Sequence, residues 1–259
     1  MGKNYSTLGN ESMSIIYFDI CAIPLYLMIL FVCFSRKMTQ GSTNRLFIAT
    51  VLLSLLSTVA DLGMEITSNI FTRRSTRRMK PEMPPRELIE RVVEAGRTSP
   101  SGANSRTTHI IVITKREVLE ELAAIVQEAF AAMEVGPDAY ISLRNSVSAA
   151  KKGGYVFHYG APVLIVTANR KGYGNAIADS ACVLENMMIA ANALDLGACW
   201  INQLHWLDED AKVRACLEKL GLGENETVTG GLILGYSYDG LPVRSELKRM
   251  GNPVTWIAD

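Results

Sequence analysis

Residues 176–203 read AIADSACVLENMMIAANALDLGACWINQ, and this stretch decides the fold. Its first part, Ala176 to Leu196, is long and largely apolar, which is typical of a helix buried in a core or at an interface. Gly197 to Ile201 (GACWI) then predicts a strand. A buried helix that leads directly into a strand indicates layers of helix and sheet around one core.

The sequence on both sides alternates between helix and strand in the same way. The predicted helices span Pro85–Arg97, Arg116–Met133, residues 138–152, and Asp208–Leu220 with Asp208 as N-cap and Gly221 as C-cap. The predicted strands span His109–Thr114, Pro162–Thr167 and Thr227–Tyr236. Strands separated by helices favour an α/β or α+β sandwich, in which helices flank a sheet.

The first seventy residues are far more apolar than the rest of the chain. Met13 to Phe34 is long enough to cross a bilayer as a helix, and the basic residues Arg36 and Lys37 follow it directly. A second, shorter apolar run covers Leu46 to Met64. The sequence therefore predicts a membrane-anchor region over residues 1–69, with one or two transmembrane helices, and a separate domain over residues 70–259.

Other interpretations of the first seventy residues stay open. The first run also resembles a signal peptide, although it lacks a small-residue cleavage pattern. A buried hairpin of soluble helices is a second alternative. A third is a segment not native to the domain, joined near Ile70-Phe71. The positive charges do not fix an orientation, because Arg36, Lys37 and Arg45 compete with the basic residues that follow Thr72.

Charge and cysteine content exclude several classes of function. The chain has 26 basic and 26 acidic residues, so no net field draws it to nucleic acid. The five cysteines are odd in number and contain no CxxC pair. A disulfide framework and a zinc site are therefore not expected, and the cysteines are interpreted as reduced thiols.

Residues 73–78 read RRSTRR and suit a phosphate group. The planar fork of arginine binds phosphate oxygens in pairs, and a serine hydroxyl adds a donor. The alternative is a basic cluster beside a membrane that contacts anionic lipid.

Four further segments are each ordinary alone. Pro100 to Asn104 (PSGAN) predicts a turn between a helix and a strand, where ligand-binding loops often lie. Leu196 to Gln203 (LGACWINQ) is a strand whose end offers backbone amides. Leu234-Gly235-Tyr236 and a late arginine, Arg244, complete the set.

In this order and spacing, RRSxR, PSGxN, LGxCWI, LGY and the late arginine resemble the FMN-dependent nitroreductase family, over about Ile70 to Ile257. The resemblance implies an α+β fold with a sheet flanked by helices and an intertwined homodimer. Each FMN would lie at the dimer interface, and the tail after Arg249 would embrace the neighbouring chain. One departure concerns Arg106-Thr107-Thr108, which stands where the family often has Gln-Pro-Trp.

The resemblance also implies the cofactor-binding residues. Residues of the basic cluster and the late arginine would bind the FMN phosphate, the PSGxN loop would lie against the flavin, and two backbone amides would face its O4 and N5 edge. The phosphate ligands implied are Arg73, Arg74, Ser75, Arg77 and Arg244. The loop residues are Pro100, Ser101, Gly102 and Asn104, and the two amides belong to Asn202 and Gln203.

The implied activity is NAD(P)H oxidation coupled to reduction of nitroaromatics, quinones or other electron-poor acceptors. No catalytic side chain is expected, because the flavin carries the chemistry, and His109, His158 and His205 are interpreted as structural. NADH and NADPH are cytosolic, so the domain is expected in the cytoplasm, whether anchored or not. The alternatives are a membrane sensor that binds flavin without turnover, a deiodinase-like reductase using Glu134, Tyr140 and Lys151 or Lys152, and a lipid-interacting structural protein.

Overall fold

The computed structural model describes residues 67–240 and 252–258. The chain divides into two units between Met64 and Glu65, and every described residue belongs to the second. The predicted apolar runs Met13–Phe34 and Leu46–Met64 lie outside the described residues, and so does Arg244. Within the two described ranges, no helix is both long and apolar enough to cross a membrane.

A single antiparallel sheet lies at the centre of the domain. Its strands are β1 (His109–Ile113), β2 (Val163–Arg170), β3 (Gly197–Ile201) and β4 (Glu226–Gly235). Their order is β1-β2-β4-β3, so β1 and β3 form opposite edges. The two inner strands are buried along almost their whole length, which is consistent with the apolar runs at residues 163–166 of β2 and 232–234 of β4.

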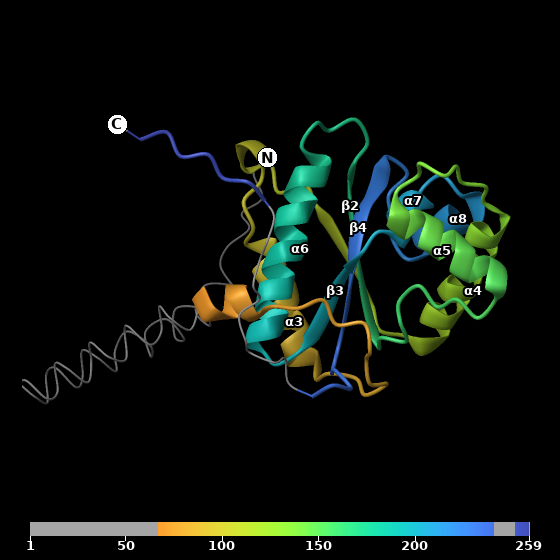
Figure 1. The fold of residues 1–259 in the computed structure, drawn as a ribbon, viewed down its shortest axis with the longest axis horizontal. Helices are drawn as coiled ribbons and strands as arrows, with labels where there is room; N and C mark the ends of the chain where they lie inside the picture. The colour runs from red at the N-terminus through yellow and green to blue at the C-terminus, as the bar shows by residue number, and fades with distance from the viewer. Residues whose placement is uncertain (1–66, 241–251, 259) are drawn as a thin grey trace, which may run out of the picture. The chain divides into compact units, whose positions relative to one another are not determined.

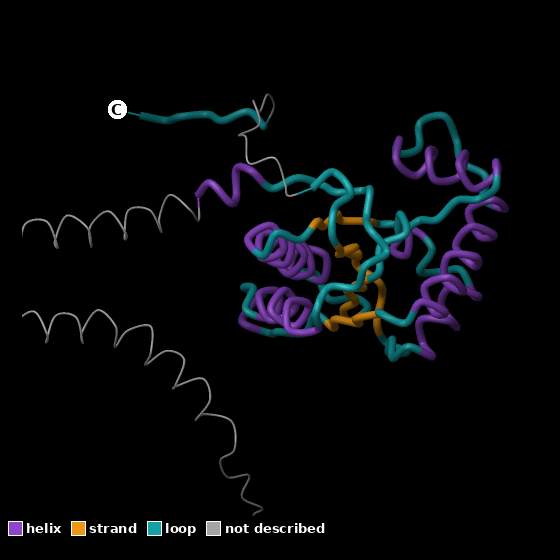
Figure 2. The backbone as a smooth tube through the Cα atoms, turned by 90° about the horizontal axis from the view of Figure 1, so that it is seen from below, coloured by secondary structure: helices purple, strands orange, loops and turns teal. Residues whose placement is uncertain are grey.

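Helices cover both faces of this sheet (Figures 1 and 2). One face carries α3 (Arg86–Arg97) and α6 (Ala176–Ala193), which pack against each other. The other face carries α4 (Arg116–Ala132), α5 (Ile141–Lys152), α7 (Gln203–Trp206) and α8 (Ala211–Lys219). The predicted α+β fold, a sheet flanked by helices, is confirmed.

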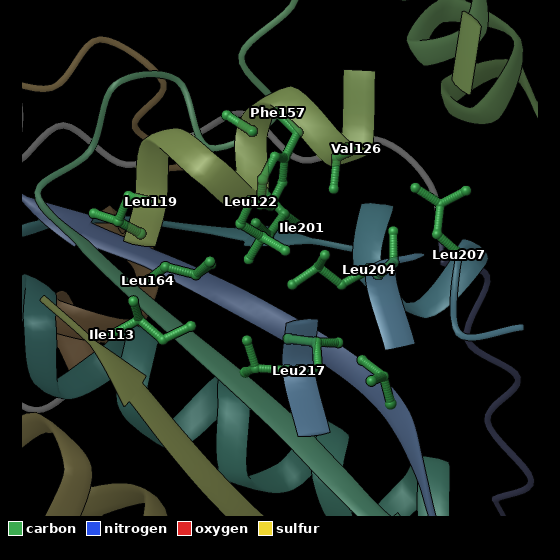
Figure 3. Close-up of a cluster of buried hydrophobic side chains, with 14 of the residues drawn as sticks. Ile113, Leu119, Leu122, Val126, Phe157, Leu164, Ile201, Leu204, Leu207 and Leu217 are labelled. Carbon is green, nitrogen blue, oxygen red and sulfur yellow. The ribbon is translucent and has the colours of Figure 1, made fainter. Parts of the chain in front are cut away.

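Two hydrophobic clusters, one on each face, hold the layers together. Alternate residues of β2 divide between them, with Val163 and Ile165 toward α6 and Leu164 and Val166 toward α4. Figure 3 shows the α4-side cluster, where Leu122 and Leu164 are fully buried. Each fully buried leucine contributes about 1.5–3 kcal/mol to folding.

Most predicted elements match the structure to within a few residues. The helix predicted to reach Leu196 ends at Ala193, because Asp195 adopts a left-handed φ of 58° that turns the chain into β3. The short helix α7 was not predicted. The predicted N-cap Asp208 is wrong, because the cap is Asp210, whose carboxylate accepts hydrogen bonds from the N–H groups of Lys212 and Val213.

Asp208 has a different role, as a buried link between α8 and β4. It is 7% exposed and accepts hydrogen bonds from Thr227 Oγ1 at 2.6 Å and from the Val228 N–H at 3.0 Å. Its Oδ1 also lies 3.3 Å from Arg214 Nη1. These partners hold the carboxylate away from the start of α8, which is why the next acidic residue caps the helix.

We expect Asp210→Ala to lower the free energy of unfolding by about 1 kcal/mol, the usual loss for a helix cap. Asp208→Ala should lower it by about 3 kcal/mol, because it leaves the Thr227 hydroxyl and the Val228 N–H without their acceptor and removes one of the partners of Arg214. Urea denaturation of both variants measures the two losses. A larger loss for Asp210→Ala would contradict these roles.

Candidate functional site

The arginine-rich segment is fixed along the outer edge of β3. Ser75 forms a parallel bridge with Ala198, and the Thr76 N–H donates to the Ala198 carbonyl at 2.9 Å. Thr76 also packs against Gly197, where a Cβ atom would come within 2.8 Å of Thr76 Cγ2. This close approach requires glycine, so the LG of the LGACWI segment positions the segment that carries the arginines.

The predicted phosphate ligands gather where β3 begins. Arg73 Nε lies 3.5 Å from Glu185 Oε1 on α6, and the Arg74 Nη1 donates to the Phe71 carbonyl at 3.1 Å. Arg77 is exposed. Burial raises the pKa of the Cys199 thiol, and the charges of Arg77 and Arg73 together with a hydrogen bond to Ser75 oppose that shift. The cluster is therefore an ordered group of cations and one hydroxyl.

The two predicted amide donors lie at the other end of the same strand. Asn202 follows β3, and its side-chain oxygen accepts a 2.6 Å hydrogen bond from Trp200 Nε1. Gln203 is 7% exposed, and its Nε2 donates to Tyr155 Oη at 3.1 Å. Its Oε1 is buried and has no hydrogen-bond partner among the described residues. From Ala198 to Asn202 the strand rises by about 13 Å.

The PSGAN loop lies before β1, where residues Gly102–Asn104 form a single 3₁₀ turn. Ala103 and Asn104 have left-handed φ values of 51° and 54°. The Gly102 N–H donates to Asp179 Oδ1 on α6 at 2.9 Å. The loop therefore has a defined conformation that a buried carboxylate on a helix supports.

One chain does not bring this loop to the arginine cluster or to the amides. The loop leads into β1, one edge of the sheet, whereas the other predicted ligands follow β3, the opposite edge. Three strand spacings separate these edges, which is about 14 Å. His109, at the start of β1, pairs with Ala168 of β2. Ala198, near the start of β3, is level with Val163 of β2, because both pair with Leu234 of β4. Ala168 and Val163 are five residues apart on β2. For the arginine cluster, that offset adds about 17 Å along the strands. The amides follow Ile201, which is level with Ile111 of β1, so for them the separation is the spacing across the sheet.

Several residues that support the site were not predicted from the sequence. Asp179 and Glu185 contact the loop and Arg73, respectively. Both are the acidic residues of an otherwise apolar helix, and a carboxylate at 5% exposure, as for Asp179, requires partners. The presence of two acidic residues in this apolar helix was the sequence feature that could have identified them. No motif in the sequence indicates the hydrogen bond between Trp200 and Asn202.

Two of the three histidines have polar protein partners. His109 Nδ1 lies 2.8 Å from Glu226 Oε2, and His205 Nδ1 lies 2.6 Å from the Val228 carbonyl. His158 is 6% exposed, and its Nδ1 has no partner among the described residues. Burial lowers the pKa of His158 below its usual value of 6.5. It lines a cavity of about 740 Å³ together with Leu119, on the α4 side of the sheet.

The comparisons with known proteins agree with this fold. The model of the nitroreductase family matches residues 70–236. A nitroreductase from Bacteroides fragilis, solved with bound FMN, is 33% identical, with 74% of this chain and 98% of that chain covered and a TM-score of 0.66. A protein from Archaeoglobus fulgidus, named "Putative NADH dehydrogenase/NAD(P)H nitroreductase", is 28% identical over 179 residues, which is 68% of this chain and 87% of that protein. An FMN-dependent nitroreductase from Mycobacterium smegmatis, solved with NADPH, shares the fold at 20% identity over 74% of this chain and 96% of that chain, with a TM-score of 0.56.

The pH dependence of stability tests the burial of His158. The unfolded chain binds a proton at this histidine near pH 6.5, whereas the folded chain resists it, so stability is present above about pH 6.5 and is lost as pH falls. We expect the free energy of unfolding to fall less between pH 7.5 and pH 5 in His158→Leu than in wild type. Equal slopes in the two proteins would show that His158 is protonated without penalty in the fold.

Proposed function

This chain belongs to the nitroreductase family, and we propose that residues 70–259 form an FMN-dependent NAD(P)H oxidoreductase. The observation that carries the proposal is the layout of β3. Cations and a hydroxyl lie beside its first residues, and two amides lie where it ends, about 13 Å further along. This layout suits a ligand with a phosphate at one end and a polar-edged ring at the other.

The phosphate end is proposed to use Arg73, Arg74, Ser75 and Arg77, with Arg244 as a further ligand. The backbone of this segment is already fixed by its pairing with β3, so binding costs little additional order. Guanidinium groups and a hydroxyl are suitable donors for phosphate oxygens. Glu185 would orient Arg73 through their 3.5 Å contact.

The ring end is proposed to use the backbone amides of Asn202 and Gln203. Such donors stabilise negative charge on a reduced ring. The side chain of Gln203 is buried, and its Nε2 donates to Tyr155 Oη, which leaves only the backbone of this residue for the ring. We assign no proton transfer to a side chain.

The chemistry that FMN supplies in such a site is acceptance of hydride from NADH or NADPH, followed by electron transfer to a second substrate in a ping-pong cycle. Nitroaromatics, quinones and other electron-poor acceptors are the proposed second substrates. Support comes from the B. fragilis nitroreductase, which has bound FMN, and from the A. fulgidus relative, whose name includes NAD(P)H.

A second copy of the chain is proposed to complete the site. The loop Pro100–Asn104 faces the wrong edge of the sheet to meet a ligand on β3 of its own chain, but a homodimer would supply it from the partner. Apolar side chains are available for such an interface. Ile177 on α6 is 60% exposed, and Trp256 and Ile257 in the C-terminal tail are 87% and 98% exposed.

The deiodinase alternative is weaker. Of its predicted residues, Glu134 and Lys151 bind each other at 2.7 Å, and Tyr140 packs edge-to-face on Trp206. An acidic and a basic group that neutralise each other have little left to offer an amino-acid zwitterion. A flavin sensor without turnover remains the alternative of another class, and the membrane anchor over residues 1–69 remains a prediction, with the domain proposed to face the cytoplasm.

Mixed dimers test both the ligand assignment and the shared site. One chain carries Arg73→Ala with Arg77→Ala, and the other carries Gly102→Val, whose side chain would collide with Asn175 Nδ2 and Tyr173 Oη. We expect each variant alone to lose FMN, and the co-expressed, doubly tagged mixed dimer to bind about one FMN, because one of its two sites has both halves intact. Flavin absorbance per dimer and quinone reduction report the result.

The matched control is Arg86→Ala, which removes an exposed arginine whose ion pair among the described residues is with Glu90 on its own helix. This variant should keep two FMN per dimer. A mixed dimer as empty as its parents would show that each site is built from one chain. Parents that retain wild-type FMN content would show that these residues are not its ligands.

A further inference from the structure

The turn that follows Ser101 holds three non-glycine residues in the left-handed region. The φ values of Ala103, Asn104 and Arg106 are 51°, 54° and 50°. Asparagine tolerates this region, but alanine and arginine rarely adopt it, because Cβ crowds the backbone. Such a conformation persists only where surrounding contacts impose it.

Contacts inside the turn are local. The Arg106 N–H donates to Ser101 Oγ at 2.9 Å, the Asn104 N–H donates to the Ser101 carbonyl at 2.9 Å, and Arg106 Nε donates to Asn104 Oδ1 at 2.9 Å. Arg106 and Asn104 are exposed, so water competes for these bonds. They close the turn but do not fix it to the body of the domain.

The link to the body is Asp179, in the first turn of α6. It is 5% exposed, and it accepts the Gly102 N–H at 2.9 Å through Oδ1 and the Tyr173 hydroxyl at 2.9 Å through Oδ2. One carboxylate oxygen therefore holds the loop directly, and the other holds Tyr173. A buried carboxylate this close to a helix N-terminus is also favoured by the helix dipole.

Tyr173 fixes the same turn from a second side. Its hydroxyl lies 3.0 Å from Ser105 Oγ and 3.4 Å from the Gly102 carbonyl. Its ring lies under the Arg170 guanidinium, 5.6 Å from the ring centroid, at the end of β2. Asp179 thus holds the Gly102 N–H, and the Tyr173 hydroxyl, which donates its hydrogen to Asp179, can accept one from Ser105 Oγ further along the turn.

We infer that Asp179 and Tyr173 are positioning residues, which hold the 101–106 turn in its left-handed conformation so that Ser101 and Gly102 meet the flavin in a preset arrangement. The inference rests on the proposed FMN site. It explains why a carboxylate is buried in a largely apolar helix, where a charge costs free energy unless hydrogen bonds compensate for it. Loss of these hydrogen bonds would let the turn relax, and FMN binding would then have to order it again.

The experiment uses the full chain as the purified dimer and measures the FMN dissociation constant by quenching of flavin fluorescence. Asp179→Ala removes both acceptors, Asp179→Asn keeps an acceptor for the Gly102 N–H, and Tyr173→Phe removes only the hydroxyl. The matched control is Asp208→Asn, because Asp208 is another buried carboxylate that accepts one backbone N–H and one hydroxyl, but at α8.

We expect Asp179→Ala to weaken FMN binding about tenfold or more, since it removes hydrogen bonds to a charged acceptor, and Asp179→Asn to recover most of that loss. Tyr173→Phe should weaken binding less, in the same direction. Hydrogen exchange in the peptide spanning residues 98–108 should accelerate in Asp179→Ala. Asp208→Asn should lose stability without a change in either measurement.

Three outcomes would overturn the inference alone: an FMN affinity in Asp179→Ala within twofold of a wild type that does bind FMN, equal losses in Asp179→Asn and Asp179→Ala, or the same loss in Asp208→Asn. If Asp179→Ala does not fold, Tyr173→Phe decides, and an unchanged affinity there also overturns it. A wild-type dimer that binds no FMN overturns the proposed function itself, and the inference with it.

Discussion

The pairing of residues 75 and 76 with Ala198 is the interaction on which the proposed site depends. A run of arginines repels itself and, on a mobile segment, would have no fixed geometry. The bridge from Ser75 and the 2.9 Å hydrogen bond from the Thr76 N–H tie that run to the edge of a rigid sheet. Once the segment is fixed there, the direction of β3 also fixes where the amides of Asn202 and Gln203 lie relative to the cations.

Helix α6 contacts the segment before the arginines, Arg73 and the PSGAN loop. Near its C-terminus, Asn192 Nδ2 donates to Asn69 just before the arginines; in its middle, Glu185 contacts Arg73; and in its first turn, Asp179 holds Gly102. The 13 residues from Asp179 to Asn192 span about 20 Å of helix. One helix therefore links these pieces of the proposed site within one chain.

The fold could be predicted from sequence because its signals are local and mutually consistent. The apolar β2 run, the helix at Ala176 and the GACWI strand are recognisable within short windows. The cap at Asp210 was missed because Asp208, two residues earlier, satisfies the same local pattern, and only its contacts with β4 distinguish the two. The family motifs identified the arginines and the loop as candidates. That they lie beside opposite edges of the sheet follows from the strand order, which the sequence does not reveal. Asp179 could not be linked to the loop from sequence, because its partner there, Gly102, lies 77 residues away along the chain.

The measurement that tests the central claim most directly is an absorption spectrum of the purified full chain, recorded without oxygen before and after NADH or NADPH is added. The account predicts oxidised-flavin bands near 450 nm, roughly as for any flavoprotein, which bleach when the nucleotide is added and return with a quinone acceptor. Bands that persist would describe a flavin binder without turnover. A colourless protein that also fails to take up added FMN would contradict the account.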